Sequence, residues 1–483
     1  MLMLAAVALA GTVRPDASST STPVATDSAL AGVDWNAAGG ETVEFLSRLL
    51  QARSINPPGD ETLAVNVVAE KLRAEGIESE VIEFAPGRGS LVARLPGNGQ
   101  DKPLCLLSHV DVVPAEAERW TVDPYSGLVR DGFVWGRGAL DMKGMTAVEV
   151  MTLVTLKRLA VPLSRDVVLL AVADEEVDGQ GIDAVIAQWD QIGCSHVVNE
   201  GGLGLSDLIF DGQTFHAISV AEKGAVWLKM IASGSPGHGS TPVPGRAPEH
   251  LARALQRLAE REDAVVWSDA HLETFRRAGR AGGGLKGLIL SSPALTRLLA
   301  KRSLLSMPPM RATLTNTVNV TGFFGGDQPN VVPSEVGAVL DCRILPGFMP
   351  EDIVRELIAL VDDPAVRFEV ISASTGNESP WDDPFFNALA ARAVEGQEGA
   401  VAGPVRSPGY TDSKALRPLG ARAYGYAPFV IDGELLGTMH GDDERVPVAE
   451  VHAGLRRLAA AVLDVSLARP DGPMGSPRGE APR

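Results

Sequence analysis

Apolar residues along this chain recur in two alternating patterns, one typical of strands and one typical of helices. Short uninterrupted apolar runs predict buried strands, and longer stretches with an apolar face every three or four residues predict amphipathic helices. The predicted strands span residues 78–84, 91–95, 104–107, 167–173 and 196–199, and the predicted helices span residues 41–52, 61–75 and 143–159. This alternation indicates an α/β fold with a doubly wound sheet.

The pattern changes after residue 217, where strands and helices follow in the order βαββαβ. That order predicts a small α+β domain of the ferredoxin-like type, inserted between two parts of the α/β domain. Within it, residues 263–311 form a helical excursion that glycines interrupt, and no role is assigned to it. The predicted elements are strands at 218–232, 313–321, 335–344 and 366–372, and helices at 248–261 and 351–361.

Five segments are therefore expected along the chain. Residues 1–33 hold a signal-like segment and a disordered linker at 15–31, rich in Ser, Thr, Ala and Pro. The α/β domain takes residues 34–217 and 376–468, the inserted domain takes 218–375, and a disordered tail takes 469–483. Residues 2–10 resemble a signal-peptide core, but the first basic residue, Arg14, comes after them, so both a cytoplasmic and an exported protein stay open. No other run is long and apolar enough to span a bilayer.

Composition and charge narrow the choice of partners. With 483 residues, of which 45% are hydrophobic, the chain is globular and exceeds what one core usually supports. A net charge of −18, which no block of Lys and Arg offsets, opposes binding to nucleic acid or to anionic membrane surfaces. Cys105, Cys194 and Cys342 are odd in number and lack a C-x-x-C spacing, so they are expected to be small buried residues rather than a disulfide framework or a zinc ribbon.

Side chains that can bind metal follow three of the predicted strands directly. His109 comes after the run at 104–107, Glu175 and Glu176 follow the run at 167–173, and Glu200 follows the run at 196–199. In open α/β sheets, ligands bind outside the carboxyl ends of the strands, so these side chains are expected at one edge. Two further ligand types, Asp141 and His440, lie elsewhere in the chain and complete a set that suits two metal ions sharing a carboxylate.

Five motifs follow one another in a fixed order: SHVDVVP at 108–114, GRGALDMKG at 136–144, DEE at 174–176, NEGG at 199–202 and GHGS at 237–240. Together they resemble the M20 metallopeptidases, which include glutamate carboxypeptidases, aminoacylases, succinyl-diaminopimelate desuccinylases and the yeast carboxypeptidase-S type. The resemblance runs from about residue 35 to residue 467. Asn-Glu-Gly-Gly at 199–202 is similar to the aminoacylase and carboxypeptidase-S branch, whereas glutamate carboxypeptidases usually have Asp at the position of Glu200.

The resemblance implies a role for each candidate ligand. Asp141 would bridge two metal ions, His109 and Glu200 would complete one site, and Glu176 and His440 would complete the other. Imidazole and carboxylate ligands suit Zn²⁺, with Mn²⁺ and Co²⁺ as competitors.

Two neighbours of these ligands receive catalytic roles. Asp111 would accept the second ring N–H of His109 and fix its tautomer. Glu175 would take a proton from the metal-activated water and pass it to the leaving amine. The peptide bond between Asp141 and Met142 is expected to be cis, as in relatives.

Other positions match substrate-handling residues of the family. His238 would stabilise the oxyanion, in dimeric members from the partner subunit's inserted domain, so a homodimer through that domain is expected. Alternatively, His238 only holds its turn, and Arg343 only points outward in a solvated ion pair. The candidate substrate-binding residues are Asn316, Arg343, Gly409 and Thr411.

The sequence thus predicts a di-metal hydrolase of an amide or peptide bond next to a free carboxylate. Carboxypeptidase, dipeptidase and N-acyl-amino-acid hydrolase activities all stay open, with a small peptide or an N-acyl amino acid as substrate. A binding protein that kept the fold without catalysis is one alternative. A serine hydrolase is another, but Ser233 stands where the first glycine of a G-x-S-x-G elbow belongs.

Overall fold

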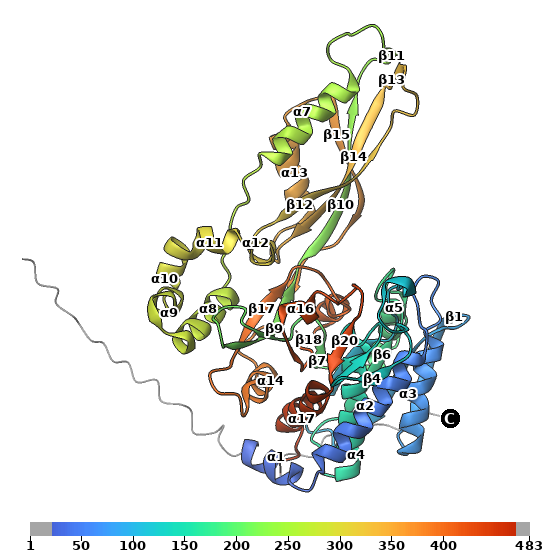
Figure 1. The fold of residues 1–483 in the computed structure, drawn as a ribbon, viewed down its shortest axis with the longest axis vertical. Helices are drawn as coiled ribbons and strands as arrows, with labels where there is room; N and C mark the ends of the chain where they lie inside the picture. The colour runs from blue at the N-terminus through green and yellow to red at the C-terminus, as the bar shows by residue number, and fades with distance from the viewer. Residues whose placement is uncertain (1–21, 470–483) are drawn as a thin grey trace, which may run out of the picture.

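The computed structural model describes residues 22–469, which form a mixed α/β body with a long second domain rising from it (Figure 1). The body is built around an eleven-stranded sheet with the order β1-β2-β6-β3-β7-β18-β9-β8-β19, to which β16 and β17 add by pairing with β9. Its strands are β1 (Ser79–Ala85), β2 (Arg88–Leu95), β3 (Leu104–His109), β6 (Val167–Val172), β7 (His196–Asn199), β8 (Gly204–Ser206), β9 (Thr214–Glu222), β16 (Asn377–Glu378), β17 (Val401–Ser407), β18 (Arg422–Gly425) and β19 (Val430–Ile431).

Helices cover both faces of this sheet, as the doubly wound pattern predicted. Along β3, Leu104 and Leu106 join the core on one face while Cys105 and Leu107 join the core on the other, because successive strand side chains point to opposite faces. The first face packs against α2 (Trp35–Gln51), α3 (Thr62–Ala74), α4 (Lys143–Leu159), α14 (Pro384–Val394) and α17 (Val448–Asp464), and the second against α5 (Gln180–Ile186), α6 (Trp189–Ile192) and α15 (Ser413–Leu416).

The central strands β6, β3, β7 and β18 run parallel to one another. Their carboxyl ends therefore meet at one edge of the sheet, where a separate three-stranded sheet also lies. The smaller elements of the body are β4 (Leu128–Arg130), β5 (Phe133–Trp135), β20 (Arg445–Pro447), α16 (Gly433–Leu436) and the 3₁₀ turns η1 (Ala117–Arg119) and η3 (Arg417–Leu419).

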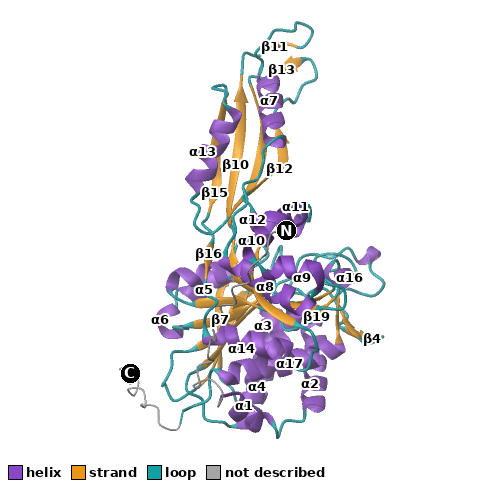
Figure 2. Cartoon of the chain, turned by 90° about the vertical axis from the view of Figure 1, so that its left-hand side faces the viewer, coloured by secondary structure: helices purple, strands orange, loops and turns teal. Residues whose placement is uncertain are grey.

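The second domain, called the lid below, has the βαββαβ order that the sequence predicted. Its four antiparallel strands lie in the order β12-β14-β10-β15, with α7 and α13 packed on the sheet (Figure 2). A two-stranded ribbon, β11 with β13, forms its far tip in Figure 1. The lid elements are β10 (Gly224–Ser233), β11 (Gly237–His238), α7 (Ala247–Ala259), β12 (Thr317–Phe324), β13 (Val331–Val332), β14 (Glu335–Ile344), α13 (Pro350–Val361) and β15 (Val366–Ala373).

The border between body and lid lies at Lys223, not at residue 217. The predicted strand at 218–232 is two strands, because β9 (214–222) belongs to the body sheet and β10 to the lid. A methyl group on Gly224 would lie 2.2 Å from the carbonyl oxygen of Ser374, so the two connections between the domains touch at this glycine. The alternation of apolar residues continues across the junction and gives no sign of it.

The prediction that residues 263–311 belong to the lid is wrong. These residues form a helical lobe, defined here as α8 to α12, whose first helix packs on β17 of the body. Thr274 in α8 donates a hydrogen bond to the carbonyl of Pro404, and Arg277 donates to the carbonyl of Ala402. The lobe consists of α8 (Asp269–Gly282), α9 (Gly284–Ser291), α10 (Pro293–Leu295), the π-helical turn η2 (Thr296–Ala300), α11 (Lys301–Leu305) and α12 (Pro308–Leu314). Since α12 takes the first residues of the predicted strand at 313–321, β12 begins only at Thr317.

Two further predictions need correction. Part of the expected linker at 15–31 is helix α1 (Thr22–Leu30), which packs on α17 and buries Thr26 and Leu30. Cys105 and Cys194 form a disulfide between β3 and the start of β7, so only Cys342 is a buried thiol. The odd cysteine count hid this pair, because nothing in the sequence shows that two cysteines 89 residues apart lie on neighbouring strands. The signal-like segment at 2–10 and residues 470–483 of the predicted tail lie outside the described residues.

Candidate active site

Five predicted metal ligands meet at the carboxyl edge of the body sheet, although they come from five separate segments. His109 is the last residue of β3, Glu176 lies in the turn after β6, and Glu200 follows β7. Asp141 lies just before α4, and His440 lies in the loop between α16 and β20. The parallel order of β6, β3 and β7 brings the first three together, as predicted.

Asp141 lies at the centre of this cluster. Its Oδ1 is 3.1 Å from Nε2 of His109, and its Oδ2 is 3.0 Å from Nε2 of His440. Nε2 of His109 is also 3.8 Å from Glu200 Oε1, and Nε2 of His440 is 3.1 Å from Glu176 Oε1. Each oxygen of the aspartate therefore faces a different imidazole, and each imidazole has a further carboxylate beside it.

These distances fit ligands that would share metal ions. Ligand atoms about 2.0–2.2 Å from a tetrahedral Zn²⁺ lie roughly 3.3 Å from one another. His109, Asp141 and Glu176 offer ligand atoms that all lie within 4.8 Å of one another, and so do His109, Glu175 and Glu200. The residues that are present thus form a candidate metal-binding site.

The negative charges in the cluster also favour the binding of cations. Burial, with the nearby charge of Asp141, raises the pKa of Glu200 well above its ordinary value. Hydrogen bonds to Asp141 and Glu176 raise the pKa of His440 to about 10. Several carboxylates this close repel one another in a buried site, and a bound divalent cation relieves that repulsion.

Asp111 holds both the His109 ring and the turn that carries Glu175 and Glu176. Nδ1 of His109 lies 3.1 Å from the backbone oxygen of Asp111 and 3.4 Å from its carboxylate. The same carboxylate accepts hydrogen bonds from the backbone N–H groups of Glu175 and Glu176 and from the Asn56 amide. The ring thus makes its hydrogen bond to the backbone oxygen of Asp111 rather than to the carboxylate beside it, and that carboxylate fixes the turn that carries two acidic side chains.

Glu175 points into the same centre from that turn. Its carboxylate lies within 4.8 Å of His109 and Glu200 ligand atoms. Burial, reinforced by the charges of Asp412, Glu176 and Asp111, raises its pKa well above the ordinary range, while His109 opposes that shift. These surroundings favour the protonated form of the Glu175 carboxyl group.

A buried ion pair positions the loop before α4. Glu444 accepts hydrogen bonds from the backbone N–H groups of Leu140 and Asp141 at 2.8 and 3.1 Å, and Arg137 donates to its other oxygen at 2.6 Å. The peptide bond between Asp141 and Met142 is cis, as predicted. Sequence reasoning missed Glu444, although it comes only four residues after His440 in the acidic run 442–444.

A second missed carboxylate, Asp412, lies on the side of the site that faces the lid. It follows Thr411 directly and is buried, and this burial raises its pKa to about 7. The hydroxyl of Thr411 donates to Glu222 at 2.7 Å and accepts from Asn199 at 3.2 Å. Thr411 thus ties β9 to β7 beneath the loop at 407–413, which also contains Gly409.

Arg343, on lid strand β14, already has a carboxylate partner within its own strand. Its Nε and Nη2 donate to the two oxygens of Asp341 at 2.7 and 3.0 Å, and its guanidinium lies 5.3 Å from the centre of the Tyr410 ring. The Nζ of Lys414 lies 3.3 Å from the same ring centre. The lid residue Arg343 and the body residue Lys414 therefore both place a cation beside the Tyr410 ring. Nη1 of Arg343 is not one of the two donors to Asp341.

The remaining two predicted residues are not part of the metal cluster. Asn316 is buried at the start of β12, where its side-chain oxygen accepts a hydrogen bond from the N–H of Leu345. His238 is exposed on β11, at the far tip of the lid in Figure 1. A single chain thus does not bring His238 to the other candidate residues.

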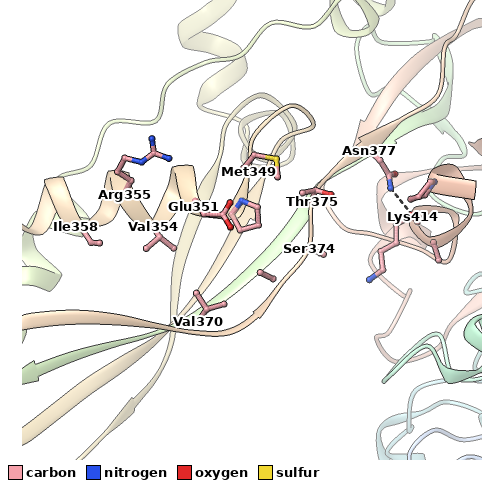
Figure 3. Close-up of a pocket in the computed structure, with 14 residues that line it drawn as sticks. Met349, Glu351, Val354, Arg355, Ile358, Val370, Ser374, Thr375, Asn377 and Lys414 are labelled. Carbon is pink, nitrogen blue, oxygen red and sulfur yellow. Dashed lines mark hydrogen bonds between the residues drawn. The ribbon is translucent and has the colours of Figure 1, made fainter.

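A groove of about 850 Å³ runs between lid and body (Figure 3). On the lid side it is lined by side chains of α13 and β15, including Met349, Val354 and Val370. Lys414 belongs to its body side, and the carbonyl of Lys414 accepts a hydrogen bond from Asn377. The groove contains none of the candidate metal ligands, so it is a crevice beside the site.

Comparison with known proteins shows the class to which the fold and site belong. Residues 105–464 match the model of peptidase family M20/M25/M40. This match covers more than half of the chain, and the chain therefore belongs to that family of hydrolases.

Curated relatives come from several branches of the family. The chain is 30% identical to the N-fatty-acyl-amino acid synthase/hydrolase PM20D1 of Homo sapiens, over 72% of this chain and 71% of the relative. It is 26% identical to the probable carboxypeptidase S-like 2 of Dictyostelium discoideum, over 72% and 68%. Aminoacylase-1 of Sus scrofa is 26% identical, over 84% and 90%.

Solved structures confirm the two-domain architecture. The M20 family metallo-carboxypeptidase Sso-CP2 from Sulfolobus solfataricus aligns with a TM-score of 0.66 at 19% identity, covering 88% of this chain and 99% of that one. The YXEP protein of Bacillus subtilis, described as a dinuclear metal-binding peptidase from the M20 family, aligns with a TM-score of 0.58 at 12% identity, covering 89% and 98%. At these identities the likeness concerns the fold.

Proposed function

We propose that this hydrolase cleaves an amide bond next to a free carboxylate, in N-acyl amino acids or small peptides, with the help of two divalent cations. The observation that carries the proposal is the position of Asp141, whose two oxygens face His109 and His440 separately. One site would be held by Asp141, His109 and Glu200, and the other by Asp141, Glu176 and His440. Imidazole and carboxylate ligands favour Zn²⁺, with Mn²⁺ and Co²⁺ as competitors.

Glu175 is proposed as the general base and acid. When bound, two such cations lower the pKa of a water molecule and polarise the scissile carbonyl. Glu175 lies beside His109 and Glu200 without being needed to complete either proposed site. Its carboxylate can accept the proton of the attacking water and donate it to the leaving nitrogen.

The contact between lid and body is proposed to recognise the substrate carboxylate. Arg343 and Lys414 bring two cations to Tyr410. The Asp341 carboxylate holds the guanidinium of Arg343 in one orientation, which leaves its Nη1 edge for a ligand. Gly409 and Thr411 in the adjacent loop, and Asn316 at the base of β12, are proposed to shape the same pocket.

His238 is proposed to act from a second subunit. Its Nδ1 accepts a hydrogen bond from the backbone N–H of Ser240 at 3.2 Å, which places the ring proton on Nε2. An Nε2–H group directed at a developing oxyanion is a suitable donor. Because His238 is exposed at the lid tip, a homodimer that exchanges lid tips would bring it to a catalytic cluster.

The relatives named above include hydrolases of N-acyl amino acids and carboxypeptidase-like proteins, which supports both substrate classes. A direct test would assay the purified, metal-loaded protein on three free acids, namely an N-acetyl amino acid, a long-chain N-acyl amino acid and a dipeptide, and on the C-terminal amide of each. We expect turnover of at least one free acid and little turnover of its amide. Equal turnover of acid and amide would contradict carboxylate recognition, and no turnover of any substrate would contradict the proposed activity.

Metal content tests the same proposal independently of the substrate. Two equivalents of metal per chain are expected from elemental analysis, and Asp141→Ala should lose both, since both sites share this ligand. Retention of two equivalents by that variant would contradict the bridging role.

A further inference from the structure

The helical lobe differs from the rest of the chain in its charge. Between Glu273 and Asp327 the sequence contains no Asp or Glu but eight Lys and Arg residues, in a chain whose net charge is −18. The net charge of the whole chain opposes binding to anionic surfaces, but this one segment is basic. This segment includes most of the lobe.

The lobe also exposes an unusual number of leucines. Leu285, Leu288, Leu298 and Leu299 are 75%, 63%, 76% and 56% exposed, more than any other leucine of residues 22–469. They lie on α9 and on η2, which pack against each other, and the Thr296 hydroxyl of η2 donates to the carbonyl of Ile289 at 3.0 Å. These four side chains, called the leucine patch, thus belong to one compact unit.

Cations without partners accompany the patch. Arg297, Lys301 and Arg302 are exposed, and none makes an ion pair with another residue of the described part of the chain. Lys286 differs from them, because its Nζ donates to the carbonyl of Ile209 and lies 4.7 Å from the Phe210 ring centre, which anchors α9 to the body.

We propose that the leucine patch and its three unpaired cations dock the protein on an anionic lipid bilayer. Short helices that combine exposed leucines with Lys and Arg bind in the interface plane, where apolar side chains enter the acyl boundary and cations meet the lipid phosphates. No helix among residues 22–469 has the length and apolar character to cross a bilayer. In Figure 1 the lobe projects sideways from the junction of body and lid, so it can approach a flat surface.

Charge and shape together favour lipid over another occupant. The negative charge on the rest of the chain would be repelled by an anionic bilayer, so attraction is confined to the lobe and sets one orientation. The four leucines of the patch are each more than half exposed, on a lobe that projects from the molecule in Figure 1. A lipid surface accepts such a protrusion, whereas a protein partner or a second copy would have to offer a matching apolar hollow.

Flotation of the full-length protein with vesicles tests this proposal. Wild type should float with vesicles of phosphatidylcholine and phosphatidylglycerol, and not with phosphatidylcholine alone, and added salt should weaken the binding. Leu285→Ser/Leu298→Ser should lower the vesicle partition coefficient at least ~10-fold, from the apolar area that no longer enters the lipid. Arg297→Ser/Lys301→Ser/Arg302→Ser should remove the preference for phosphatidylglycerol.

The lid offers a matched control in Val320→Ser/Phe323→Ser, which changes side chains that are 41% and 69% exposed on β12. This control should float like wild type. All variants should keep the wild-type thermal midpoint and the wild-type turnover of a water-soluble substrate.

Absence of wild-type flotation with anionic vesicles would overturn the proposal, and so would equal losses in the control and the patch variants. A dimer that Leu285→Ser/Leu298→Ser dissociates, without any binding to vesicles, would also overturn it and assign the patch to contact between copies of the chain.

Discussion

At the scale of single residues, neighbouring acidic side chains receive different tasks from the groups around them. Glu175 and Glu176 are adjacent, and both backbone N–H groups bind the Asp111 carboxylate. The side chain of Glu176 reaches His440 at 3.1 Å, whereas that of Glu175 lies near His109 and Glu200. One is thus a candidate ligand and the other a candidate proton carrier.

Changing the two glutamates separately tests this division. Glu175→Gln should keep two metal ions per chain and lower kcat by at least ~10²-fold, because the amide cannot exchange the proton. The matched variant Glu176→Gln should lose metal instead. Metal content and kcat, measured on the same preparations, check both expectations. Loss of metal from Glu175→Gln would identify that residue as a ligand.

Glu444 affects the candidate metal cluster through the backbone N–H groups of Leu140 and Asp141. Glu444→Ala leaves the buried Arg137 guanidinium unpaired and frees the N–H groups of Leu140 and Asp141. We expect the free energy of unfolding to fall by about 3–5 kcal/mol and metal affinity to fall ~10–100-fold. Denaturant titration and competition with a chelator measure the two effects. Glu434→Ala, which removes a largely exposed partner of Arg445, is the control and should cost less than about 1 kcal/mol.

At the scale of elements, the central strands were predictable and the connections between domains were not. Continuous apolar runs predicted β3, β6 and β7, and the residues directly after them are the ligands that the structure brings together. The break at Lys223 was missed because β9 and β10 continue one alternating pattern. Glu444 and Asp412 were missed because their roles depend on contacts with Arg137 and with the surroundings of His109, which are distant in sequence.

The disulfide was missed for a related reason. A sequence shows which cysteines exist, but their pairing depends on the order of strands in the sheet. That order, β6-β3-β7, places Cys105 next to the segment that precedes β7. Excursions such as the helical lobe are equally hidden, since amphipathic helices pack on any apolar surface that the fold offers them.

Strand β9 also contains an acid-sensitive group, His216. The Tyr426 hydroxyl lies 3.0 Å from its Nδ1, and its Nε2 lies 3.2 Å from Gln397 Oε1, a pair of contacts that suits a neutral ring. Burial lowers the pKa of His216 from its ordinary value near 6.5 to about 4. Below pH 6.5 the unfolded chain therefore binds a proton at His216, whereas the folded chain binds it only as the pH nears 4.

This contribution to stability is complete above pH 6.5 and is lost as the pH falls toward 4. The expected loss is about 1.4 kcal/mol per pH unit in that window. His216→Asn should remove this part of the slope, so the difference in unfolding free energy between wild type and variant should shrink with acidification. Denaturant titrations from pH 7 to pH 4 check it, and parallel curves would contradict the assignment.

At the scale of the whole molecule, the length of the lid separates His238 from the catalytic cluster of its own chain (Figure 1). A dimer in which each lid tip reaches the other subunit predicts complementation. Glu175→Gln and His238→Ala chains should each be nearly inactive, and mixing them should restore activity, because one site of the heterodimer has both groups intact.

Subunit exchange must be shown in the same sample, for example with two distinguishable tags. A mixture of His238→Ala with wild type controls for dilution of activity. Exchange without recovered activity would place the action of His238 within one chain or remove it from catalysis.

The disulfide between Cys105 and Cys194 has a consequence for the integrity of the chain. Its two ends, 89 positions apart in the sequence, close a covalent ring that includes His109, Asp141, Glu175 and Glu176. In the unfolded state such a ring lowers chain entropy by an amount equivalent to roughly 4–5 kcal/mol. A protease that nicks any loop within the ring leaves two fragments joined, so a cut molecule would still carry most of its catalytic residues in one piece and would separate into two bands only on a reducing gel.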